Sequence, residues 1–137
     1  MKRTASAHWE GDLKAGKGSL STQSTTLNKT QYSFNTRFAD GVGTNPEELL
    51  AAAHAGCFTM AVSMILGQAG FVATSLDTVA SVNLEGLAIT GVHLSIKGTV
   101  PNISEAQFSE ITKGAEKTCL ISKVLSIPIT SESSLTK

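Results

Sequence analysis

Residues 45–67 of this 137-residue chain read NPEELLAAAHAGCFTMAVSMILG, the longest apolar stretch in the sequence. Asn45 is a good N-cap, and Pro46 suits the first helical position. Glu48 stands where its side chain can bond back to the cap amide, as in a capping box. Gly67 and Gly70 supply stop signals. These signals predict one long helix.

The same stretch has to be considered as a membrane span, because residues 49–66 carry no charge. Its length is at the lower limit of roughly 18–20 residues for a span. Against a span stand His54, Thr59 and Ser63, many alanines in place of leucines, and the absence of cationic flanks. A helix that is apolar all round is also what a globular core encloses. We therefore expect a buried central helix and no membrane association.

Strand signals lie on both sides of this helix. Short alternating runs separated by turn residues predict a meander of about three strands within residues 1–40, closed by the turn-like GVGTNP at 41–46. Beyond the helix, residues 72–100 predict two long strands with a turn near Gly86. The short segment LISKVL leads to a final strand at about residues 127–131.

A second helix is predicted from Ser104 to about Lys117, because Ser104 and Gln107 have the spacing of a capping box. Its apolar stripe has helical spacing and extends to the second cysteine through Phe108, Ile111, Ala115 and Cys119. The predicted order of elements is strands, a long helix, strands, a helix and a strand. This order predicts an α+β fold, with antiparallel strands around the central helix. The length fits a single domain over residues 1–137.

Charge and composition narrow the classes of partner. The chain has eleven basic and eleven acidic residues, a formal net charge of zero, 16% charged and 41% apolar residues. No basic stripe is available for phosphates, so nucleic acid is not an expected partner. The start, MKRTASAHWEGD, lacks the apolar segment of a signal peptide, so we expect a cytoplasmic protein with reduced thiols.

The two cysteines, Cys57 and Cys119, are too few for a disulfide framework. Cys57 is either a small buried hydrophobe or a reactive thiol, and reaction requires the thiolate. Cys57 is about three turns into the helix, beyond the reach of the helix dipole, and apolar burial would raise its pKa. A reactive Cys57 therefore needs a cation from elsewhere.

Two side chains could influence the Cys57 thiol. His54 stands at i−3 on the same helix face and could act as a base for Cys57. Arg37 stands in FNTRF, which we expect to be the end of a strand just before the loop. Without a role at the thiol, His54 would be a histidine packed in the core and Arg37 a solvated surface residue. A metal site is not expected, because His8 and His93 are isolated in strand-like runs and no CxxC motif occurs.

The segment GTNPEELLAAAHAGCF (43–58), preceded by AHWEGDLKAGKGSLST (7–22) and FNTRF (34–38), resembles the osmotically inducible protein C (OsmC) branch of the OsmC/Ohr family. The resemblance continues to the second cysteine in KTCLISKVL (117–125). It implies an OsmC/Ohr-like fold, an intertwined homodimer with the active site at the subunit interface, and no bound cofactor.

The resemblance also implies roles for individual residues. Cys57 matches the family's peroxidatic cysteine, Cys119 its resolving cysteine, and Arg37 the arginine that holds the thiolate. Glu47 matches the glutamate that orients this arginine. One departure is visible, since Leu120 follows Cys119 where many relatives have proline. That departure puts the rate of the resolving step in doubt.

The implied activity is reduction of organic hydroperoxides, and more weakly of hydrogen peroxide, through a Cys57 sulfenic acid and a Cys57–Cys119 disulfide. Such a peroxidase serves in defence against oxidative or osmotic stress, and an external dithiol of the lipoyl type reduces the disulfide. The alternative is a non-catalytic stress-related dimer that binds an apolar ligand in its interface groove. Thioredoxin-type exchange is disfavoured, because the cysteines are far apart in sequence.

One geometric question stays open at the level of sequence. Glu47 and Cys57 are ten residues apart, which is roughly 15 Å along a continuous helix. Either the helix starts later, or Arg37 bridges the two residues, or the partner chain contributes part of the site.

Overall fold

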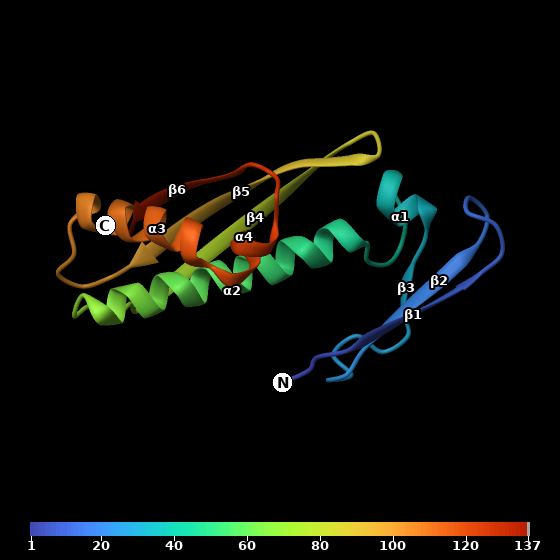
Figure 1. Ribbon diagram of the computed structural model, residues 1–137, viewed down its shortest axis with the longest axis horizontal. Helices are drawn as coiled ribbons and strands as arrows, with labels where there is room; N and C mark the ends of the chain where they lie inside the picture. The colour runs from blue at the N-terminus through green and yellow to red at the C-terminus, as the bar shows by residue number, and fades with distance from the viewer. Residues whose placement is uncertain (137) are drawn as a thin grey trace. The chain divides into compact units, whose positions relative to one another are not determined.

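Figure 1 shows the computed structural model of the protein, which describes residues 1–136. The contacts cluster in two compact units, Met1–Leu49 and Leu50–Lys137, and each is described by itself. The elements are mixed helix and strand, with two small sheets and one long helix, α2, over Pro46–Gln68. The α+β class predicted from the sequence is therefore confirmed.

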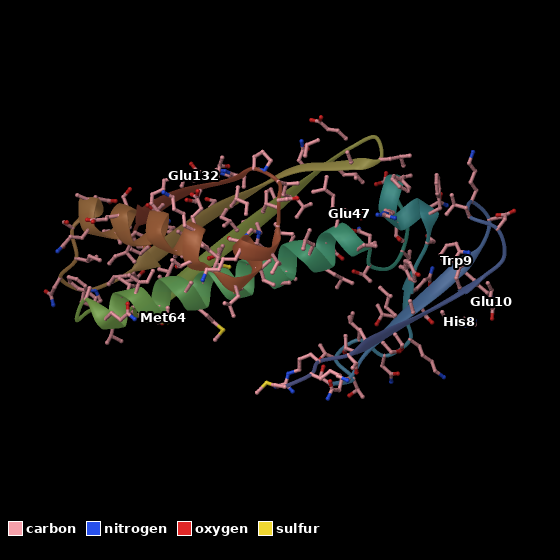
Figure 2. The ribbon with its side chains drawn as sticks, viewed as in Figure 1. His8, Trp9, Glu10, Glu47, Met64 and Glu132 are labelled. Carbon is pink, nitrogen blue, oxygen red and sulfur yellow. The ribbon has the colours of Figure 1, made fainter. Side chains whose placement is uncertain are left out.

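The first unit holds a three-stranded antiparallel sheet of β1 (Ala5–Glu10), β2 (Lys17–Thr22) and β3 (Thr30–Tyr32), in that order. The meander expected within residues 1–40 is thus correct. The rings of Trp9 and Tyr32 lie across this sheet with centroids 5.5 Å apart, a separation typical of packed aromatic pairs. His8, Trp9 and Glu10 on β1 are labelled in Figure 2.

The segment FNTRF forms the short helix α1 (Phe34–Phe38), where the sequence suggested the end of a strand. The cause is local capping. The Ser33 hydroxyl accepts the Thr36 N–H, and the Thr36 hydroxyl accepts the Ser33 N–H, so both halves of a capping box are present. This helix places Arg37 in its last turn.

The start of α2 is as predicted, with one difference. The Asn45 side chain accepts the Glu48 N–H at 2.7 Å, which makes it the N-cap. The Glu48 carboxylate does not return to the cap amide, because it accepts the Thr44 hydroxyl at 2.8 Å. The helix runs without a break to Gln68, so a later start of the helix is excluded as the answer to the Glu47–Cys57 question.

The second unit holds the sheet β4–β5–β6. Strands β4 (Ser75–Glu85) and β5 (Ala88–Thr99) form an antiparallel hairpin, and Gly86 adopts the positive φ of 59° in its turn, where glycine is favoured. Strand β6 (Ile129–Leu135) is parallel to β5, which corrects the expectation of antiparallel strands throughout. The chain returns to this edge through a helical crossover, and such connections join parallel strands.

Two helices form that crossover. Helix α3 (Glu105–Thr118) begins at Ser104 with the predicted capping box to Gln107. Helix α4 (Leu120–Val124) occupies the segment that the sequence left without a regular structure. Cys119 is both the C-cap of α3 and the N-cap of α4, so its thiol lies at the junction of two helices.

The core of the second unit lies between the helices and one face of the sheet (Figure 1). Alternate residues of β5 supply the sheet side, as the two-residue period of a strand requires. Gly98 on β5 leaves room for Phe108, since a Cβ there would stand 2.7 Å from the ring. The buried hydrophobic residues are Phe58, Val62, Leu66, Val92, Leu94, Ile96, Val100, Phe108, Ala115 and Cys119.

Helix α2 is not the fully buried helix that the sequence suggested. In its most apolar window only 28% of the residues are buried, and Met60 and Met64 are 75% and 56% exposed. Figure 2 shows Met64 extending outward from the helix. By length and composition α2 could cross a membrane, but core helices of soluble proteins pass the same test. One apolar face of α2 is therefore without cover in the single chain.

Candidate active site

Helix α2 and the α3–α4 junction bring the two cysteines together, although they are 62 residues apart in sequence. Cys57 is half-buried on α2, and Cys119 is only 1% exposed. Both are free thiols, and each thiol acts on the pKa of the other. The two sulfur atoms are thus already close in the reduced protein.

The surroundings of Cys57 favour its thiolate. Burial alone would raise the pKa of Cys57. Hydrogen bonds from the Cys119 thiol and from the backbone N–H groups of Ile121 and Leu120 outweigh that effect, and the pKa lies below the ordinary thiol value. The net effect favours the Cys57 thiolate over the neutral thiol.

Cys119 is shifted in the opposite direction. Burial raises its pKa, and its hydrogen bond to the Cys57 sulfur raises the pKa further. The backbone N–H and hydroxyl of Ser122, with the N–H of Ile121, oppose this shift without cancelling it. Because the shifts are opposite, Cys57 ionises first and Cys119 is the thiol that donates to it. The pair therefore has one nucleophile and one proton-bearing partner.

Arg37 and Glu47 form an ion pair within the first unit. Arg37 Nε donates to Glu47 Oε1 at 2.8 Å, with Glu47 buried and the arginine side chain half-exposed. The guanidinium also lies 5.3 Å from the centre of the Phe38 ring. The bond to Glu47 uses Nε, so the terminal NH₂ groups of the guanidinium stay available to an anionic partner. Figure 2 labels Glu47, which is in the first turn of α2.

A cavity of about 280 Å³ lies beside Arg37 in the same unit. Four of its eight lining residues are aromatic. Its lining residues are Trp9, Leu13, Tyr32, Ser33, Phe34, Arg37, Phe38 and Pro46. An apolar wall with one cation at its edge suits a small molecule that combines an apolar body and a polar group.

His54 is neither exposed nor directly bonded to Cys57. It is 0% exposed on α2, and its Nε2 lies 2.7 Å from the Ser122 hydroxyl on α4. Burial lowers the pKa of His54, so the ring is neutral near pH 7. The sequence proposed either a packed histidine or a base for Cys57. The contacts favour a packed histidine that is tied to the cysteine pair through Ser122.

The residues singled out in the sequence fall into two pairs. Cys57 and Cys119 form one pair in the second unit, and Arg37 and Glu47 form the other in the first unit. Within residues 1–136 no group of three or more His, Cys, Asp or Glu side chains could hold a metal ion. Sequence reasoning missed Ser122 and the backbone donors of α4, because nothing in LISKVL marks them as neighbours of α2.

The sequence and the fold are similar to those of known proteins. Residues 39–133 match the family model of the OsmC-like proteins. The chain is 49% identical over 134 residues to Peroxiredoxin OsmC of Escherichia coli strain K12, covering 95% of this chain and 94% of that protein. The same identity and coverage hold for Peroxiredoxin OsmC of Shigella flexneri.

Solved structures match the fold over the full length. The organic hydroperoxide resistance protein OhrB of Bacillus subtilis superposes with a TM-score of 0.70 at 21% identity, covering 97% of this chain and 98% of that one. The OsmC-like protein of Mycoplasma pneumoniae gives a TM-score of 0.74 at 14% identity, covering 100% and 99%. At such identities the likeness concerns the fold alone.

Proposed function

This chain belongs to the OsmC-like protein family and is a thiol-dependent peroxidase of the peroxiredoxin type, with a role in stress defence. From that premise we propose that Cys57 is the peroxidatic cysteine and Cys119 its resolving partner. The observation that carries the assignment is the pair of neighbouring free thiols whose pKa values are shifted in opposite directions.

The first step consumes the hydroperoxide. The Cys57 thiolate attacks the terminal peroxide oxygen, the O–O bond breaks, and the departing alkoxide takes a proton to leave as an alcohol. Cys57 becomes a sulfenic acid, oxidised by two electrons. The hydrogen bonds that lower the pKa of Cys57 supply the thiolate for this step.

The second step closes the disulfide. The Cys119 sulfur attacks the Cys57 sulfur of the sulfenic acid, and the hydroxyl leaves as water with the proton of the Cys119 thiol. An external dithiol then reduces the disulfide by thiol–disulfide exchange and is itself oxidised. We propose a lipoyl-type dithiol as this reductant, on the basis of the family resemblance.

Arg37 and Glu47 are proposed to assist the first step. The guanidinium stabilises the thiolate and the charge that develops on the peroxide oxygen. Glu47 fixes the guanidinium through Nε, which leaves the terminal NH₂ groups available to bind an anion. Because α2 is continuous, the sequence alternatives that remain are Arg37 as the bridge and a contribution of the partner chain.

The proposed substrates are organic hydroperoxides in preference to hydrogen peroxide. The aromatic cavity beside Arg37 supports this preference, because it offers apolar contact to an organic substituent. The chain is also similar in fold to a protein described as an organic hydroperoxide resistance protein. The lowered pKa of Cys57 favours catalysis over the alternative of a non-catalytic binder of apolar ligands.

We further propose that the protein is an intertwined homodimer of single-domain subunits in the cytoplasm. The uncovered apolar face of α2, with Met60 and Met64, supports a second copy as its cover. The formal net charge of zero leaves little electrostatic repulsion between copies.

Changing the ion pair tests the role of Arg37. We expect Arg37→Ala to lower kcat/KM for cumene hydroperoxide on the order of a hundredfold, the scale seen when a donor to a developing anion is removed. Glu47→Gln keeps the shape but removes the charge that orients the guanidinium, so its loss should be smaller. Steady-state peroxide consumption with a dithiol measures both.

Glu132→Gln is the matched control, because it removes a carboxylate from the exposed His93–Glu132 pair. Its kcat/KM should equal that of the wild type. An Arg37→Ala protein that is folded and keeps the wild-type kcat/KM would show that Arg37 has no part in the reaction.

A further inference from the structure

The turn between β1 and β2, residues 11–16, carries a leucine at the rim of the cavity beside Arg37. Leu13 is 66% exposed, yet it is one of the residues that line this cavity, together with Trp9 and Tyr32. No step of the proposed reaction uses it. An apolar side chain at the rim of an apolar cavity can cover an organic ligand, so Leu13 is a candidate contact for the organic part of the substrate.

Hydrogen bonds within the turn fix the position of Leu13. Asp12 Oδ1 accepts the Ala15 N–H at 2.6 Å. The Asp12 carbonyl accepts the Gly16 N–H at 2.9 Å. Both bonds span Leu13, so the backbone of the turn holds this residue at the rim although its side chain is largely exposed.

Trp9, labelled in Figure 2, ties the turn to the cavity wall. Its indole N–H donates to the carbonyls of Gly11 at 3.2 Å and Asp12 at 3.3 Å. The ring itself packs against Tyr32 in the wall, with centroids 5.5 Å apart. Gly16 permits this approach, because a Cβ there would stand 2.9 Å from Trp9 Nε1. The turn and the wall are thus held together within the first unit.

We propose that Leu13 is a specificity-determining residue that contacts the organic substituent of the hydroperoxide and favours organic hydroperoxides over hydrogen peroxide. Asp12 is the positioning residue that holds the turn. The inference rests on the proposed function, in which the peroxide end of the substrate meets the Arg37 guanidinium. The organic end then lies against the apolar wall that Leu13 completes.

The volume of the cavity narrows the class of substituent. Its 280 Å³ is just below the roughly 300–1,000 Å³ of common small-molecule pockets. Such a volume suits a compact aromatic or branched alkyl group, such as the cumyl group of cumene hydroperoxide. Hydrogen peroxide has no apolar part that Leu13 could contact, so its reduction should not depend on this residue.

The size of the effect follows from the place of Leu13 at the rim. In apolar enzyme pockets one methylene changes the relative kcat/KM of two substrates by about 10–200-fold. Leu13→Ala removes most of an apolar side chain, but the contact of a largely exposed residue is partial. We therefore expect a loss of about tenfold, the lower end of that range.

Trp9 reports on the cavity without any peroxidase chemistry, because it is the only tryptophan of the chain and lines the cavity. The probe is 2-phenyl-2-propanol, the alcohol formed from cumene hydroperoxide. It should change the fluorescence of Trp9 in a saturable way, with a Kd about tenfold weaker in Leu13→Ala. Leu87→Ala is the matched control, because Leu87 is an exposed leucine in the turn of the other sheet. Its Kd should equal that of the wild type.

The kinetic test compares cumene hydroperoxide with hydrogen peroxide in one steady-state assay with a dithiol. Leu13→Ala should lower kcat/KM for cumene hydroperoxide about tenfold, mainly through KM, and leave kcat/KM for hydrogen peroxide unchanged. Leu13→Met, of similar volume, should keep most of the preference. Asp12→Ala should show part of the loss, whereas Asp12→Asn, which keeps an oxygen acceptor for the Ala15 N–H, should show little.

Two results would overturn the inference while the proposed function stands. One is a Leu13→Ala protein with the wild-type Kd for the alcohol and the wild-type preference between the two peroxides. The other is an equal loss with both peroxides, since that would mean general damage to the site. A wild-type protein that reduces neither peroxide would overturn the proposed function, and the role of Leu13 in specificity with it.

Discussion

Replacing Cys57 with serine should abolish hydroperoxide reduction while leaving the fold intact. Serine is nearly isosteric, but its hydroxyl is not ionised near pH 7 and so cannot replace a thiolate nucleophile. The neutral groups that lower the pKa of Cys57, from Cys119, Leu120 and Ile121, act by favouring its thiolate, which serine does not form. We expect kcat/KM to fall by about three orders of magnitude or more, as for the loss of other enzyme nucleophiles.

The measurement is consumption of cumene hydroperoxide with excess dithiol, followed by the thermal midpoint of each protein. Ser63→Ala is a useful control, because it changes a hydroxyl on an exposed position of α2. Its rate should be that of the wild type. Retention of the wild-type rate by Cys57→Ser would mean that the peroxidatic group is elsewhere.

Replacing Cys119 should separate the two steps of the cycle. Cys119→Ser keeps a donor to the Cys57 sulfur but cannot form the disulfide. We expect about one hydroperoxide to be reduced per chain, after which the sulfenic acid persists and is over-oxidised to the sulfinic acid by excess peroxide. Mass spectrometry of the Cys57 peptide follows this course.

Cys119→Ala is the matched variant, because it removes the donor as well. Without the bond from Cys119 the pKa of Cys57 should rise, so the rate of the first turnover should reach its plateau at a higher pH than in Cys119→Ser. Sustained turnover of either variant with a dithiol would show that Cys119 is not the resolving residue. Coincident pH profiles would show that Cys119 does not help to ionise Cys57.

The parts of the fold that the sequence predicted well depend on local signals. Asn45 and Ser104 cap helices through bonds to residues three positions away, so both helix starts could be located from sequence alone. The alternation of apolar residues gave the β4–β5 hairpin for the same reason. Strand direction is not a local property, and the parallel position of β6 was therefore missed. The predicted helix between β5 and β6 was the one local sign of a parallel pair, because helical crossovers join parallel strands.

In the candidate site, too, the sequence revealed what depends on local signals and missed what depends on tertiary packing. Cys57 could be singled out from sequence because it stands in an uncharged helix, where a thiolate needs outside help. The sequence pointed to a cation for that help, whereas the contacts identified in the second unit are neutral donors from α4 and Cys119. These donors approach through tertiary packing across 62 residues or more, which no spacing reveals. The exposed face of α2 was missed, because a helix has the same apolar sequence whether its faces are covered by the chain's own core or by another molecule.

The most direct test of the cysteine pair is to count thiols and map disulfides after the reduced protein meets one equivalent of cumene hydroperoxide. The account predicts that two thiols are lost per chain, that non-reducing peptide mapping joins Cys57 to Cys119, and that the bond lies within one chain. Two thiols that remain free while the hydroperoxide is consumed, or a disulfide between chains through Cys57 alone, would contradict it.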